Sequence, residues 1–168
     1  MCIRDRPDTG WVFAFPAIEF APGSIKAIGK NGGKIVAQQE IATAGPAVAI
    51  KMTPILGPDG LQADGLDVAL FDVEVVDAKG QRCPTDAARI DFTCTGPAIW
   101  RGGYNSGVID STNNLYLSTE LGINRVAVRS TLEAGTIRVT ASREGLKPAE
   151  VTLASHPVKV VALSLIHI

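Results

Sequence analysis

An alternation of apolar and acidic residues near the middle of the chain constrains the fold most. In the stretch 66–84, LDVALFDVEVVDAKGQRCP, the two kinds of side chain alternate at Phe71, Asp72, Val73, Glu74 and Val75. A two-residue period puts the apolar side chains on one face of a β-strand and the carboxylates on the other. The segment 77–80, DAKG, has turn chemistry, since Asp can bond its own backbone and Gly adopts a positive φ. The stretch therefore predicts a half-buried strand that ends in a tight turn.

Later segments repeat this pattern. Apolar and polar residues alternate in 88–95, 123–131 and 136–142, and no segment shows a sustained helical period. Short strands separated by turn residues are typical of an antiparallel sandwich of the immunoglobulin type. We therefore expect an all-β chain in which residues 61–161 form a complete immunoglobulin-like β-sandwich. Its predicted core includes Phe71, Val73, Phe92, Val126, Val128, Ile137 and Val139.

The N-terminal part predicts a second, truncated β-module. The segment 31–33, Asn-Gly-Gly, is a strong hairpin signal, because both central residues of a type I′ turn need a positive φ. We expect strands on either side of it, at 20–30 and 34–41, and a further strand at 47–53. Because an immunoglobulin-like sandwich needs about seven strands, we interpret this module as half a domain.

Loop composition and the odd ends of the chain set the predicted boundaries. Gly, Pro and Asp concentrate in 55–65, as in a surface connection. The predicted domains are the C-terminal part of an immunoglobulin-like domain at 7–54 and a complete sandwich at 55–162. The ends MCIRDR (1–6) and LSLIHI (163–168) resemble translated sequencing-adapter read-through, so we exclude them from fold reasoning. The alternative is a natural terminus of unusual composition.

Charge and cysteine usage exclude several function classes. The net charge is −1 with both signs interspersed, so no basic stripe suggests nucleic acid, and no apolar run is long enough to insert into a membrane. Outside the excluded ends, the cysteines are Cys83 and Cys94. Two cysteines fit no zinc pattern. We favour two buried thiols over a disulfide, and neither reading identifies the compartment.

The segment 96–149 is specific enough to suggest a family. Its parts GPAIWRGGYNSG, STNNLYLSTELGINRVAVRST and AGTIRVTASREGLKPA resemble the C-terminal β-sandwich of bacterial glycoside hydrolases of family two, which are large β-galactosidase-like enzymes. The stretch DGLDVALFDVEVVDAKGQRCP is similar to the first strand and turn of the same domain. The segment 22–54 is similar to the end of the immunoglobulin-like domain that precedes it in those enzymes. The resemblance spans about residues 11–161.

The resemblance implies a glycosidase in which the catalysis takes place outside this chain. Family members use two glutamates at the mouth of a TIM barrel, with the carboxyl groups about 5 Å apart. This sequence has no barrel pattern, and none of its glutamates matches the catalytic motif. We therefore expect a non-catalytic accessory or structural fragment of a hydrolase acting on β-galactosides or related glycans. The implied partner is the catalytic domain of the same parent chain, with a glycan as a further partner and no cofactor.

The alternative is an immunoglobulin-like structural or adhesive module of a bacterial surface protein, because the fold alone does not separate the two. Relatives that degrade glycans suggest the periplasm or the outside of the cell. This suggestion comes from the resemblance only.

Four residues are weak candidates for carbohydrate contact: Trp100, Tyr104, Asn105 and Tyr116. Aromatic faces stack on sugar rings, and an amide offers both donor and acceptor to hydroxyl groups. The structural alternative, which we favour, has Trp100 in the sandwich core and Tyr104 packed on the adjacent sheet. In that case, asparagines of the polar loop 102–114 bond the loop backbone.

Other polar residues give no sharper hypothesis. Asp110, Asn113 and Asn114 follow no known calcium-loop spacing, and His156 stands without a nucleophile or carboxylate at a suggestive spacing. We assign no catalytic, cofactor-binding or metal-binding role to any residue.

Overall fold

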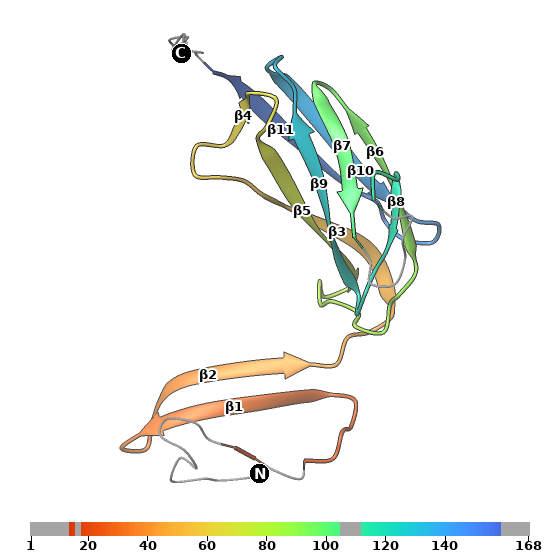
Figure 1. The fold of residues 1–168 in the computed structure, drawn as a ribbon. Helices are drawn as coiled ribbons and strands as arrows, with labels where there is room; N and C mark the ends of the chain where they lie inside the picture. The colour runs from red at the N-terminus through yellow and green to blue at the C-terminus, as the bar shows by residue number, and fades with distance from the viewer. Residues whose placement is uncertain (1–13, 16–17, 105–111, 159–168) are drawn as a thin grey trace, which may run out of the picture. The chain divides into compact units, whose positions relative to one another are not determined.

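The computed structural model describes residues 14–15, 18–104 and 112–158, so both terminal hexapeptides lie outside the described residues. The chain divides into two compact units, Met1–Thr43 and Ala44–Ile168. Their secondary structure is all β (Figure 1). The strands are β1 (Ser24–Asn31), β2 (Lys34–Ala42), β3 (Ala47–Ile55), β4 (Leu61–Ala63), β5 (Val68–Asp77), β6 (Arg89–Thr95), β7 (Ala98–Gly103), β8 (Tyr116–Ser118), β9 (Ile123–Ser130), β10 (Gly135–Ser142) and β11 (Ala149–Pro157). In the described segments, no helix is long and apolar enough to cross a membrane.

In its described residues, the first unit has an antiparallel hairpin of β1 and β2. Its turn has φ angles of 56° at Gly32 and 78° at Gly33, which confirms the predicted hairpin. Ile25 and Ile41 lie opposite one another, yet they are 64% and 70% exposed. An isolated two-stranded hairpin is marginal in water, so these apolar side chains need a further layer to bury them.

The second unit is an immunoglobulin-like β-sandwich. One sheet has the order β4-β11-β10-β6-β8 and the other the order β3-β5-β9-β7 (Figure 1). Alternate side chains of both sheets fill the core between them. All seven predicted core residues belong to the buried cluster: Phe71, Val73, Phe92, Val126, Val128, Ile137 and Val139.

The structure corrects the predicted domain boundary. Strand β3 was expected in the N-terminal module, but it pairs with β5 in the sandwich and contributes Ile50 and Met52 to the core. The Gly- and Pro-rich connection that follows β3 includes β4, which pairs in parallel with β11. The boundary therefore lies at Thr43/Ala44. The prediction failed because loop composition marks a surface connection equally well within a domain and between domains.

The turn after β5 has the predicted chemistry. Asp77 accepts hydrogen bonds from the amides of Lys79 (2.8 Å) and Gln81 (2.9 Å), and Gly80 has a φ of 77°. Cys83 and Cys94 are free thiols in the structure, as favoured from the sequence, although Cys83 is buried and Cys94 only half-buried. Burial raises the pKa of both thiols, so both are poor nucleophiles at neutral pH.

Candidate functional site

Trp100 contributes to the sandwich core. It lies in β7, half-buried, with its ring centroid 5.2 Å from that of Phe92 and an interplanar angle of 33°. Its indole Nε1 donates a hydrogen bond of 2.8 Å to the carbonyl oxygen of Asn114. The hydrophobic body and the polar atom of the indole are therefore both engaged within the sandwich, as the structural interpretation predicted for this residue.

Tyr104 differs from the structural interpretation. It directly follows β7 and is 71% exposed, so the expectation that its ring packs on the adjacent sheet is wrong. The reason is its place beyond the last residue of an edge strand, where none of the described strands covers it. Asn105 lies outside the described residues, as does Asp110.

Tyr116 is held by a cation–π contact. It lies in β8 next to the buried Leu117, so its side chain points to the outer face of the five-stranded sheet. The guanidinium carbon of Arg89 lies 4.0 Å from the ring centroid, and Arg89 also pairs with Asp91. One face of the ring is therefore covered by a neighbouring side chain.

The three described candidates do not form one platform. Trp100 faces the core, Tyr116 lies on the outer face of one sheet, and Tyr104 extends beyond the end of a strand of the other sheet. A sugar-binding surface needs aromatic faces and polar groups that converge on one ligand. Within the described residues, Tyr104 alone among the candidates presents a largely exposed ring.

A partly buried charge cluster, which no sequence pattern predicted, lies between Asp86, Thr119 and Arg143. Asp86 accepts two hydrogen bonds from the Arg143 guanidinium, 2.9 Å from Nη1 and 2.6 Å from Nη2, and one of 2.6 Å from the Thr119 hydroxyl. The ion-paired side chains are only 12% and 17% exposed. Hydrogen bonding from Arg143 holds the pKa of Asp86 below its ordinary value, although desolvation acts in the opposite direction.

This cluster joins three connections of the sandwich: the one before β6, the one after β8 and the one after β10. A forked guanidinium–carboxylate pair fixes geometry as well as charge. We interpret the cluster as a structural clasp, because both carboxylate oxygens of Asp86 already accept hydrogen bonds from protein donors. No local sequence signal could have found it, since Asp86 and Arg143 are 57 residues apart.

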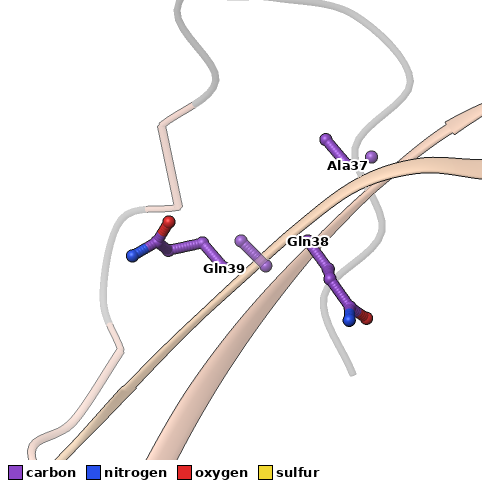
Figure 2. Close-up of a pocket in the computed structure, with 5 residues that line it drawn as sticks. Ala37, Gln38 and Gln39 are labelled. Atoms are coloured by element: carbon purple, nitrogen blue, oxygen red, sulfur yellow. The ribbon is translucent and has the colours of Figure 1, made fainter.

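The described part of the chain has no metal cluster, and its hairpin has a hollow without reactive groups. No group of three or more His, Cys, Asp or Glu residues there could hold a metal ion. A hollow of about 210 Å³ lies at the β1–β2 hairpin, and its described lining is Ala27, Gly29, Ala37, Gln38 and Gln39. Figure 2 shows the lining side chains, with Ala37, Gln38 and Gln39 labelled. Small apolar side chains and amides supply no general acid, base or nucleophile.

Comparison with known proteins points to one family. The family model for the glycoside hydrolase family 2 C-terminal domain 5 matches residues 57–152. The chain is 54% identical over 155 residues to a β-glucuronidase of Formosa agariphila, which covers 92% of this chain and 16% of that protein. It is 33% identical over 134 residues to the β-galactosidase BoGH2A of Bacteroides ovatus, covering 79% of this chain and 16% of that protein.

A solved structure agrees with these similarities. A β-glucuronidase from glycoside hydrolase family 2 matches with a TM-score of 0.81 and 52% identity, over 93% of this chain and 16% of that one. The chain thus spans about 16% of the length of the curated relatives it matches.

Proposed function

The chain belongs to the C-terminal domain 5 family of glycoside hydrolase family 2, and from this we propose that it is a non-catalytic accessory part of a larger glycosidase. The observation that carries the proposal is the family match over the sandwich, 57–152, together with the 16% share of the relatives' length. The resemblance inferred from the sequence is confirmed at the level of the family. Family membership favours the glycosidase over the adhesive module.

The architecture of the sandwich supports a structural role. Several of its described aromatic and charged side chains contact one another, as in the Trp100–Phe92 contact and the Asp86–Arg143 pair. Catalysis by two carboxyl groups about 5 Å apart needs a shaped cleft. In this proposal, the catalytic part of the same polypeptide is the partner that would supply the cleft.

We propose a β-glucuronide as the substrate of the parent enzyme, with a β-galactoside as the second candidate. The sequence resemblance alone suggested β-galactosides. The β-glucuronidase shares 54% identity over 92% of this chain, whereas the β-galactosidase shares 33% over 79%. By their names, both relatives act on β-linked sugars. The choice between the two candidate substrates therefore concerns which sugar is cleaved off, and the β-linkage is the same in both.

The hairpin β1–β2 is, in this proposal, the end of a further β-domain. Its apolar side chains are too exposed for a hairpin that is stable by itself; Val36 is 66% exposed and Ile41 is 70% exposed. Additional strands of the parent polypeptide would bury them. This retains the incomplete first module of the sequence interpretation, with its boundary moved to Thr43/Ala44.

The experiment that tests the function is recovery and expression of the complete parent gene. We expect a TIM barrel with paired glutamates and hydrolysis of 4-nitrophenyl β-D-glucuronide at least tenfold faster than of the β-D-galactoside, in kcat/KM. Faster hydrolysis of the galactoside would reverse the proposed substrate order. Tandem sandwiches with a surface anchor and no barrel would overturn the glycosidase.

A further inference from the structure

The outer face of the four-stranded sheet carries an exposed apolar patch. Side chains that point away from the core form two neighbouring cross-strand rows on β3, β5, β9 and β7. By register, one row joins Ile55, Leu70 and Ala127, and the other joins Val68, Arg129 and Ile99. We call these six residues the outer patch. Ile55, Val68 and Ile99 are 38%, 40% and 40% exposed.

The outer patch is bordered by ion pairs on the same sheet face. Arg125 pairs with Asp72 at 2.6 Å, and Lys51 pairs with Glu74 at 2.8 Å. An apolar centre with a charged border is the usual anatomy of a protein interface. The outer face of the other sheet differs, because it carries polar residues such as the hydrogen-bonded Thr93 and Thr140 and the paired Arg138 and Glu150.

Arg129 lies in the outer patch without the pairing that Arg125 has. Its row neighbours on either side are Val68 and Ile99. Its Nε atom is buried and has no hydrogen-bond partner among the described residues. A buried donor without an acceptor is costly, and arginine is among the residues that most often anchor interfaces. Because Nε is already covered and the residue is half-buried, an acceptor from outside would meet the part of the Arg129 side chain that stays exposed.

We propose that the outer patch is an intramolecular docking surface for the catalytic part of the parent polypeptide, which presents a carboxylate to Arg129 among apolar side chains. This rests on the proposed function. The relatives have ample polypeptide to supply this occupant, since about 84% of their length lies outside the matched segment, as the complement of 16%. A covalently tethered neighbour has a high effective concentration, so a patch of modest size is sufficient. Aliphatic side chains without an aromatic ring suit protein apolar groups better than a sugar.

The test compares the solvent accessibility of this patch in two contexts. Ile99→Cys reports on the outer patch, and the matched control Thr152→Cys reports on an exposed position of the opposite sheet. In the folded protein, Cys83 and Cys94 react slowly because they are at least partly buried. In the complete parent protein unfolded in urea, we expect a maleimide to label both introduced thiols quickly. In the folded parent protein, we expect Ile99→Cys to react at least tenfold more slowly and Thr152→Cys to be unchanged.

A charge reversal tests the carboxylate. In the parent protein, Arg129→Glu should restore fast labelling of Ile99→Cys, whereas Arg138→Glu on the opposite sheet should not. Equal labelling of the two positions in the parent would overturn the docking surface. Protection that disappears on dilution would overturn it too, because the occupant would then be a second copy.

These outcomes are separable from the proposed function. Failure of the docking surface leaves glycoside hydrolysis by the parent intact. Failure of the proposed function would appear as a parent without a barrel or without glycosidase activity. Protection of Ile99→Cys in such a parent would also overturn the docking proposal, since the occupant would not be a catalytic part.

Discussion

The carboxylate of Asp77 accepts a hydrogen bond from the backbone amide of Gly45 across 2.8 Å, although 32 residues separate the two. The thiol of Cys83 lies 3.6 Å from the carbonyl oxygen of the same glycine. The other oxygen of Asp77 is occupied by its own turn. Asp77 thus holds the segment that leads into β3 against the end of β5.

We expect Asp77→Asn to destabilise the sandwich, because an amide cannot accept hydrogen bonds at both of its polar atoms. The matched control is Asp59→Asn in the connection between β3 and β4, where the side chain is exposed. Urea unfolding followed by tryptophan fluorescence should give a lower midpoint for Asp77→Asn and an unchanged one for Asp59→Asn. Equal midpoints would show that the Gly45 contact contributes nothing.

A double-mutant cycle should separate the buried clasp from a surface pair. We expect Asp86→Ala alone to cost about 3 kcal/mol, because Arg143 is left partly buried without its partner. The control cycle uses Arg138 and Glu150, which are 57% and 50% exposed and 3.5 Å apart. Its coupling energy should stay below about 1 kcal/mol. Equal coupling energies in the two cycles would contradict the clasp.

Stability should fall in acid. Hydrogen bonds from Arg143 and from the Gly45 amide lower the pKa of Asp86 and Asp77, respectively. The unfolded chain therefore binds more protons below the ordinary aspartate pKa of about 3.9. The contribution of the two carboxylates to the free energy of unfolding is complete above that pH. It is lost as the pH falls through their lowered pKa values in the folded protein. The free energy of unfolding, measured from pH 6 to pH 2, should decrease below about pH 4, and less steeply in Asp86→Asn.

Two glycines with the same backbone angle should respond differently to alanine. Gly80 and Gly122 both have a φ of 77°. A Cβ at Gly80 meets nothing within 4 Å, whereas one at Gly122 would lie 2.1 Å from the carbonyl oxygen of Cys83. Gly80→Ala should cost about 1–2 kcal/mol from the left-handed conformation alone. Gly122→Ala should cost about 1–3 kcal/mol more, and similar urea midpoints for the two variants would argue against the close approach.

The aromatic candidates should separate in a stability measurement. Trp100→Ala removes the contact with Phe92 and should cost about 3–5 kcal/mol. Tyr104→Ala changes an exposed ring and should stay within about 0.5 kcal/mol of the unchanged chain. In the parent enzyme, a tenfold or larger fall in kcat/KM for Tyr104→Ala, about 1.4 kcal/mol, would identify a substrate contact. Unchanged kinetics would leave Tyr104 without a role in the reaction.

The sequence predicted the sandwich core because each inward position follows from local alternation. Phe71 and Val73 are buried in β5, and the Gly32-Gly33 turn forms where its φ requirement placed it. Local patterns carry no information about which strand a segment pairs with, so β3 was assigned to the wrong unit. The Asp86–Arg143 clasp and the Asp77–Gly45 bond were missed for the same reason, since each joins residues that only the folded topology brings together.

The candidate site was predicted less well than the fold. Residue type indicated that Trp100 belongs in the core, where a large apolar ring gains most from burial. Tyr104 has no such preference, and its exposure depends on whether a neighbouring strand happens to cover the end of β7. The outer patch was missed because alternation shows which residues share a face and leaves open what lies opposite that face.

The parallel pairing of β4 with β11 has a consequence for synthesis on the ribosome. Leu61 of β4 lies opposite Ser155 of β11, so this sheet is incomplete until nearly the whole described chain has been made. Such long-range pairing slows folding, because the entropy of closing a long loop is lost before the strand contacts compensate for it. During that interval, β4 and the edge of β10 that pairs with β11 lack their strand partner. We therefore expect newly made sandwich to depend on chaperone protection until β11 has emerged.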